Sequence, residues 1–300
     1  MEEGFENIAY DYSPILRIHK NGFIKWFMGT DTIPPSMDPA KPVPSKDVAN
    51  STEPTISARL YLPNNLPSSS SKLPVLVYFH GVGFVIQTTM FLNYHHYLNA
   101  LAVEARVVIG SVEYRREPQY HLPAAYDDSQ ATIKWFGAHS GGLGQEEWLN
   151  NHANLRKMYL GGDRAGPNIA HHKGLLLGEG MILSRNGTGK GIKLAGLILV
   201  HPFFWGNDIL PGESTRPHKR ALIEAYWRFA NPTSTGCDDL YNNMAMDPNL
   251  SRMGCSRIWV CVAEEDLLAR RGWHYKEIER KYINILYGCN CDKSQEDIGL

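Results

Sequence analysis

The sequence has no long hydrophobic run, no excess of one charge and no secretory leader pattern. Its longest apolar stretch, near residues 194–200, is far too short to cross a bilayer. Its 30 basic and 31 acidic residues give a formal net charge of -1, so we expect no nucleic-acid partner. Met-Glu-Glu at the first three positions is acidic, and no apolar segment follows. We therefore expect a cytoplasmic protein, with the nucleus as a second compartment, and no membrane partner.

The sequence also lacks the usual patterns of metal and phosphate sites. Its five cysteines include no Cys-x-x-Cys pair, and Cys289 and Cys291 do not have the spacing of a zinc site. We interpret the cysteines as free thiols in a reducing compartment. The glycine-rich segment 186–191 is not followed by Gly-Lys-Ser/Thr, so we interpret it as a surface loop. We expect no metal and no organic cofactor.

Short apolar runs, typical of buried strands, alternate along the chain with segments of helical spacing. We expect strands at 57–62, 75–79, 107–109, 157–160, 194–200, 258–262 and 283–286. We expect helices at 94–103, 126–136, 167–177, 220–229 and 270–282. This alternation predicts a single α/β domain over residues 1–300, with a doubly wound, mostly parallel sheet and helices on both faces. Residues 288–300 are polar and predict a disordered tail.

A serine is missing where the pattern requires one. Gly162-Asp163-Arg164-Ala165-Gly166 follows an apolar strand and opens a helix, which is the context of a Gly-x-Ser-x-Gly nucleophile elbow. The small flanking residues suit the strained backbone of such a turn. The middle residue, however, is Arg164, whose guanidinium stays protonated and cannot attack a carbonyl carbon. The sequence therefore predicts the scaffold of an elbow without its nucleophile.

A second loop has the pattern of an oxyanion hole. His80-Gly81-Val82-Gly83-Phe84 directly follows a predicted strand, about 80 residues before the elbow. In such a loop, backbone N–H groups stabilise the oxyanion formed during ester hydrolysis. Val82 interrupts the glycine run, and its β-branched side chain disfavours a left-handed backbone. We predict that this loop forms the oxyanion side of the pocket; a generic His-Gly turn is the alternative.

An ester hydrolase also needs an acid and a base. Asp266 follows the predicted strand 258–262, 102 residues after Arg164, and is the candidate acid. It can also cap the helix predicted to begin near Arg270. The last histidine is His274, inside that helix, whereas the base of such a site should come later in the sequence. We therefore assign no catalytic histidine.

Together with further segments, these motifs resemble the plant carboxylesterases, the group that includes hydroxyisoflavanone dehydratase and the gibberellin receptor. The similarity covers roughly residues 5–280. The further matching segments are 13–17, 57–63, 113–115, 122–128, 201–206, 247–251 and 263–268. The resemblance implies an α/β-hydrolase fold that cleaves small carboxylic esters with a Ser-His-Asp triad.

The resemblance also assigns positions. It puts the nucleophile position at Arg164, the acid at Asp266, and the oxyanion donors at Val82, Gly83 and Ala165. It implies a cap made by residues 1–44 together with residues 207–236. It further implies a closing loop and a C-terminal helix that the sequence after about residue 282 does not match, so we expect a truncated C-terminal element.

Several functions stay open at this point. Loss of the nucleophile or of the base costs a comparable serine hydrolase about 10⁶ in kcat, so we expect strongly impaired ester hydrolysis, that is, a pseudoenzyme. Alternatively, the chain is a receptor-like, non-catalytic binder of an apolar ester or a carboxylate. In that case Arg164 either pairs with a ligand carboxylate or simply pairs with Asp266 or Asp163. A degenerate or mis-spliced product of marginal stability is a third reading. Lyase chemistry, with Tyr114 or Tyr226 as proton carrier, is a fourth.

Overall fold

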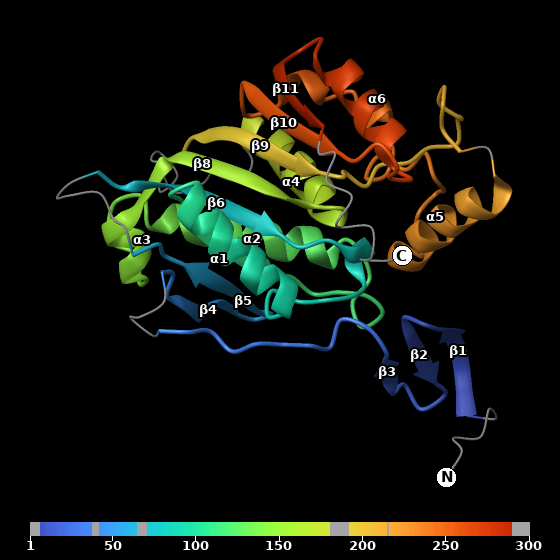
Figure 1. Cartoon of the computed structure of the whole chain (residues 1–300), viewed down its shortest axis with the longest axis horizontal. Coiled ribbons are helices and arrows are strands. Elements are labelled where there is room, and N and C mark those ends of the chain that lie inside the picture. The colour runs from blue at the N-terminus through green and yellow to red at the C-terminus, as the bar shows by residue number, and fades with distance from the viewer. Residues whose placement is uncertain (1–6, 38–41, 65–70, 181–191, 215, 290–300) are drawn as a thin grey trace.

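The computed structural model describes residues 7–37, 42–64, 71–180, 192–214 and 216–289. Its centre is an eight-stranded sheet in the order β11-β10-β9-β8-β6-β7-β5-β4 (Figure 1). The strands are β4 (Ser45–Thr52), β5 (Thr55–Tyr61), β6 (Leu73–Phe79), β7 (Val108–Glu113), β8 (Ala153–Asp163), β9 (Leu194–Val200), β10 (Arg257–Val262) and β11 (Asn284–Cys289). All neighbouring pairs from β7 to β11 are parallel, and β5 runs antiparallel to both β7 and β4.

Helices cover both faces of this sheet. They are α1 (Leu92–Glu104), α2 (Ala124–Ala138), α3 (Glu147–His152), α4 (Ala165–Gly178), α5 (Pro217–Ala230) and α6 (Ala269–Glu279). Because successive side chains of a strand point to opposite faces, β6 contributes to both layers of the core. Leu76 packs with Leu98 of α1 on one face, whereas Val77 belongs to the cluster that holds Ile169 of α4 on the other. The alternation of strands and helices predicted from the sequence is confirmed.

A second, smaller sheet lies beside α5, at one end of the molecule (Figure 1). It is antiparallel and consists of β1 (Ile8–Tyr12), β2 (Leu16–His19) and β3 (Ile24–Trp26). The ring of Tyr12 lies 4.7 Å from that of Phe229 in α5, and the fully buried Leu16 packs against Val85 and Ile86 beyond the oxyanion loop. The N-terminal segment and α5 therefore contact each other next to the predicted site.

The structure differs from the sequence-based expectations mainly at the edges of the sheets. The four strands before residue 55 and the short helix α3 were not predicted. Gly288 and Cys289, predicted to begin a disordered tail, belong to β11, whose backbone pairs in parallel register with β10. Residues 181–191, which include the predicted glycine-rich loop, and residues 290–300 lie outside the described part of the chain. Among the described helices, none is long and apolar enough to span a bilayer.

Glu279, near the end of α6, is a buried carboxyl group in the packed interior. Its side chain is fully buried, and neither carboxyl oxygen has a hydrogen-bond partner among the described residues. His171 of α4 lies beside it, with Nδ1 3.8 Å from Oε1 of Glu279 and 3.0 Å from the hydroxyl of Tyr275. Burial raises the pKa of Glu279 to about 8 and lowers the pKa of His171 well below its usual value. Both groups are therefore neutral at pH 7 in the folded chain.

This burial makes stability depend on pH. In the unfolded chain Glu279 ionises near its ordinary pKa, whereas in the folded chain it holds its proton up to about pH 8. Stability from this group is therefore complete below about pH 4.5 and is lost as the pH rises toward 8. We expect Glu279→Gln to lie within about 1 kcal/mol of the unaltered chain at pH 5 and to exceed it by about 4 kcal/mol at pH 8. Urea unfolding at both pH values measures this; an equal difference at both would contradict it.

Candidate active site

The candidate site lies where three neighbouring parallel strands end. Arg164 follows β8, His201 follows β9 and Asp266 comes four residues after β10. The carboxyl ends of parallel strands lie at one edge of a sheet, which is where ligands bind in open α/β folds. The structure therefore brings the predicted nucleophile position and the predicted acid together, and it adds a histidine that was not predicted as a site residue.

Arg164 has the backbone of a nucleophile elbow. Its φ of 54° and ψ of -107° are unusual for a residue with a side chain, and it directly precedes α4. The N–H of Arg164 donates to the carbonyl of Val200 (2.9 Å), and its own carbonyl accepts from the N–H of Phe203 (2.9 Å). A Cβ at Gly162 or Gly166 would collide with the carbonyl oxygen of Phe79. The strained turn is thus held by its neighbours and does not depend on a serine.

The side chain of Arg164 forms an ion pair with the candidate acid. Its Nη1 lies 2.7 Å from Oδ2 of Asp266, and the same oxygen lies 3.3 Å from Nδ1 of His201. Oδ1 of Asp266 accepts a hydrogen bond of 2.7 Å from the N–H of Leu268, at the start of α6. Burial opposes ionisation of Asp266, but the hydrogen bond from His201 and the charge of Arg164 lower its pKa below the ordinary value. Asp266 is therefore an anion with both carboxylate oxygens in contact. It does not cap α6 as the sequence predicted, because Leu268 is the residue that precedes the helix and no side chain caps it.

The oxyanion loop adopts left-handed backbone angles. The φ angles of Val82, Gly83 and Phe84 are 58°, 65° and 67°. Val82 thus takes the conformation that its β-branched side chain disfavours, and it packs in the cluster that holds Leu16 of β2. The N–H groups of Val82, Gly83 and Ala165 carry no hydrogen bond to described residues outside their own helices. Their role as oxyanion donors stays a prediction.

A buried hydrogen-bond network fixes this loop to the elbow. The hydroxyl groups of Tyr78 and Tyr94 donate to Oδ1 and Oδ2 of Asp163, each at 2.8 Å. The hydroxyl of Tyr94 also accepts from the N–H of Gly81 at 2.8 Å, so this N–H is not available to a ligand. Burial raises the pKa of Asp163 above its usual value, in opposition to the two tyrosine hydrogen bonds. Asp163 therefore contacts the tyrosines, whereas Arg164 pairs with Asp266.

His80 is part of the scaffold behind the loop. Its ring is completely buried, lies 4.2 Å from the ring of Tyr114 in a stacked arrangement, and has no hydrogen-bond partner among the described residues. Burial lowers the pKa of His80 well below its usual value, so the ring is neutral. The hydroxyl of Tyr114 donates to the backbone carbonyl of His80 at 2.7 Å. His80 therefore shapes the start of the loop from beneath.

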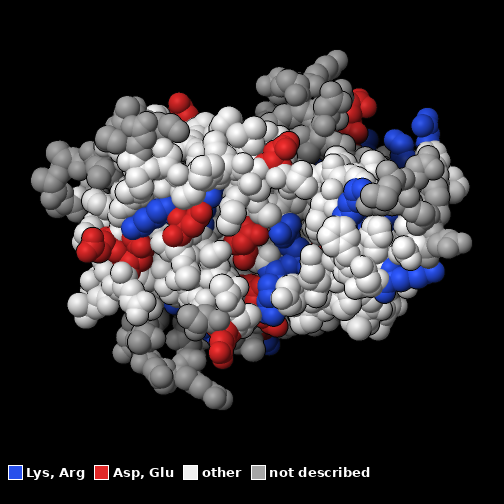
Figure 2. All heavy atoms as spheres, turned by 90° about the horizontal axis from the view of Figure 1, so that it is seen from below, with Lys and Arg blue, Asp and Glu red and all other residues white. Residues whose placement is uncertain are grey.

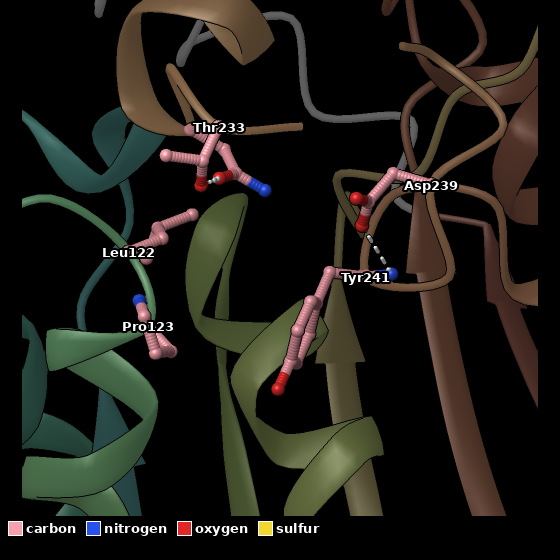
Figure 3. Close-up of a pocket in the computed structure, with 6 residues that line it drawn as sticks. Leu122, Pro123, Thr233, Asp239 and Tyr241 are labelled. Carbon is pink, nitrogen blue, oxygen red and sulfur yellow. Dashed lines mark hydrogen bonds between the residues drawn. The ribbon is translucent and has the colours of Figure 1, made fainter. Parts of the chain in front are cut away.

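A small pocket lies outside this centre, between the start of α2 and the chain that follows α5 (Figure 3). It is lined by Leu122, Pro123, Asn231, Thr233, Asp239 and Tyr241. Neither Arg164 nor Asp266 lines it. In the described parts of the chain, no group of three or more His, Cys, Asp or Glu side chains is arranged to hold a metal ion. On the face shown in Figure 2, acidic and basic side chains are interspersed across the middle of the molecule.

His201 is the site residue that sequence reasoning missed. The sequence marks it only as part of the segment 201–206, because the triad order of this fold places the base after the acid. Its position directly after a buried strand, beside the strand that carries the elbow, was the available signal. Its φ of 48° is a second unusual backbone angle at this sheet edge. Sequence order alone cannot show that residues 201 and 266 meet.

The fold and this edge of the sheet define an α/β hydrolase. Residues 76–282 match the family described as the alpha/beta hydrolase fold. A solved structure of an esterase from Pyrobaculum calidifontis superimposes with a TM-score of 0.64 at 21% identity, covering 82% of this chain and 74% of that one. This likeness shows the shared fold.

Two relatives with higher sequence identity to this chain identify its family more closely. The chain is 42% identical over 278 residues to Probable carboxylesterase 13 of Arabidopsis thaliana, covering 90% of this chain and 84% of the relative. It is 36% identical over 283 residues to 2-hydroxyisoflavanone dehydratase of Glycyrrhiza echinata, covering 91% and 84%. The chain therefore belongs to the plant carboxylesterase family, and the predicted resemblance is confirmed.

The network around Asp163 makes a testable prediction. Tyr94→Phe removes the hydroxyl that joins Gly81 to Asp163 and leaves a buried N–H without a partner. We expect a loss of about 1–3 kcal/mol in unfolding free energy, measured by urea unfolding. Tyr97→Phe on the same helix is the matched control, because Tyr97 is 43% exposed and its hydroxyl makes no hydrogen bond with the described residues. Equal losses in the two variants would show that the network contributes nothing.

Proposed function

We propose that this chain is a carboxylesterase-type protein whose pocket takes small carboxylic esters or carboxylates and whose ester hydrolysis is strongly impaired. The observation that carries the proposal is the 2.7 Å ion pair between Arg164 and Asp266 at the elbow. It places a permanent cation at the position from which this family's serine attacks, and it occupies the acid that should orient a base.

The chemistry of the elbow supports impairment. Acyl transfer on this fold needs an oxygen nucleophile whose proton is taken by a base as it attacks. A guanidinium has five N–H donors, no acceptor and no proton that it can lose at a workable pH. Oxyanion donors and ligand binding alone leave about 10³–10⁴ of rate over water in a comparable enzyme without its triad. We expect at most this residual activity here.

A second candidate function is binding of a carboxylate without turnover. Arg164 is 31% exposed in its side chain, and its contact with Asp266 uses one nitrogen, Nη1. The remaining N–H groups of its fork make no hydrogen bond with the described residues and are suited to a carboxylate. Neutral backbone donors of the oxyanion loop and a guanidinium both favour an anion. The acid product of ester cleavage has this chemistry.

Turnover of 4-nitrophenyl butyrate by the unaltered chain tests impairment. We expect a rate no higher than the residual level expected from binding and oxyanion donors, the same rate in Asp266→Asn, and no labelling by a fluorophosphonate that reacts with activated serines. Thermal unfolding of each sample shows that the protein is folded. Rapid turnover that is lost in Asp266→Asn would refute impairment.

Isothermal titration with benzoate tests the carboxylate site. We expect the unaltered chain to bind benzoate and Arg164→Gln to bind it at least about tenfold more weakly, equivalent to 1.4 kcal/mol. Arg228→Gln is the matched control, since Arg228 is exposed on α5 and forms no ion pair within the described structure. Equal affinity in Arg164→Gln and Arg228→Gln would exclude Arg164 as the carboxylate ligand.

A further inference from the structure

His201 has an environment that a surface loop does not explain. It lies directly after β9 with a φ of 48°, a conformation that is costly for a residue with a side chain. Its side chain is only 19% exposed. Its Nδ1 lies 3.3 Å from Oδ2 of Asp266 and also accepts a long hydrogen bond of 3.4 Å from the N–H of Ala263. Its other ring nitrogen, Nε2, makes no hydrogen bond with the described residues. A proton on Nδ1, donated to the carboxylate in place of the Ala263 contact, leaves Nε2 in the arrangement of a general base.

We propose that His201 is a latent general base, poised on Asp266 to take a proton from an oxygen nucleophile at position 164 and held idle by Arg164. The inference rests on the proposed function, since it explains what impairs hydrolysis at this site. It departs from the triad order of the fold, in which the acid precedes the histidine. Here the histidine comes from the strand between the nucleophile position and the acid.

Backbone contacts place His201 against position 164. The N–H of Arg164 bonds to the carbonyl of Val200, and the carbonyl of Arg164 bonds to the N–H of Phe203, both at 2.9 Å. Val200 and Phe203, whose main chains bond to the elbow, therefore lie one residue before and two residues after His201. Any short side chain at position 164 projects from a backbone fixed to this segment. The attachment of position 164 to the segment that contains His201 does not depend on the arginine side chain, because both hydrogen bonds join main-chain atoms.

Arg164 and His201 compete for one oxygen. Both contact Oδ2 of Asp266, with Arg164 at 2.7 Å and His201 at 3.3 Å. Arg164 makes the shorter of the two contacts and is permanently charged, while the N–H of Leu268 holds Oδ1. A small side chain at position 164 removes the competing cation and leaves Oδ2 to His201. Asp266 can then stabilise an imidazolium.

The other histidines do not offer this geometry. His80 and His171 are completely buried in the core, and His172 is nearly so. His274 lies within α6, and the described structure gives it no hydrogen bond or ion pair to Asp266. The charged groups that contact His201 are Asp266 directly and Arg164 through the same carboxylate oxygen. His201 is therefore the one described imidazole joined to the acid.

With serine at position 164 the reaction balances. The hydroxyl proton passes to Nε2 of His201 as the oxygen bonds to the ester carbonyl carbon, and the carbonyl oxygen becomes an oxyanion facing the loop N–H groups. His201 returns this proton to the departing alkoxide as its carbon–oxygen bond breaks. Water then attacks the acyl group by the same route, its proton passing through His201 to the serine oxygen, and the carboxylic acid leaves.

Arg164→Ser tests the proposal against Arg164→Ala. We expect kcat/KM for 4-nitrophenyl butyrate to be at least about 10²-fold higher with serine than with alanine, within the range that a positioned general base contributes. A fluorophosphonate should label the introduced serine. Arg164→Ser/His201→Asn should lose both the gain and the labelling. Asparagine is chosen because it tolerates a positive φ.

Two controls separate chemistry from folding. Arg164→Ser/His274→Gln should keep the gain, because His274 is the rival histidine next in chain order to the acid. Arg164→Ser/His201→Gly, in which glycine accepts the backbone angle, should regain turnover when free imidazole is added. A protein that has merely lost structure would not be rescued in this way.

The failure of this inference is distinct from the failure of the proposed function. If Arg164→Ser is no faster than Arg164→Ala, or if its gain survives His201→Asn, His201 is not a base, whereas impairment of the unaltered chain stands. If the unaltered chain hydrolyses the ester rapidly, impairment is wrong, and Arg164 does not hold His201 idle. A gain that requires both the serine and His201 supports the inference.

Discussion

The contact between Arg164 and Asp266 determines the character of this site. It joins the end of β8 to the loop after β10 across the strand between them, and it leaves His201 beside both groups. Asp266 is 6% exposed in its side chain and Arg164 is 31% exposed, so the pair is partly removed from water. Breaking such a pair leaves a buried charge without a partner, which costs more than an exposed pair gains. The two charges of this site therefore balance each other.

The scaffold around this pair does not depend on catalysis. The elbow keeps its strained angles because Val200 and Phe203 hold its backbone and because Gly162 and Gly166 allow Phe79 to approach. The oxyanion loop is held by the hydroxyl of Tyr94, which connects Gly81 to Asp163. Each of these contacts uses main-chain atoms or buried side chains, and none uses the side chain of residue 164. A change of the residue at the centre can therefore alter the chemistry while the fold of the site persists.

The sequence predicts the features that local residue patterns determine, and it does not predict those that depend on contacts between distant segments. The strand at residues 194–200 is apolar throughout, and its predicted and observed bounds coincide. Apart from the buried Leu16, the side chains of β1–β3 are exposed or half-buried, and these strands contact α5, a contact that no local sequence pattern indicates. Arg164 and Asp266 were identified because their motifs are local. His201 was not, because its role arises only where β9 and β10 meet in space, and the left-handed Val82 runs against local preference.

The presence of an acid at position 266 has a physical reason that does not involve hydrolysis. Arg164 precedes the first turn of α4, where backbone N–H groups make a helix N-terminus electropositive, and that first turn contains no acidic residue. The free N–H groups of the oxyanion loop add further donors on the same side. The dipoles of these N–H groups disfavour a guanidinium at this position, so an anion within reach stabilises it. Asp266 supplies that anion, and without it Arg164 would have to turn toward solvent. An arginine at the elbow thus requires the acid as strictly as a serine would, although for charge balance.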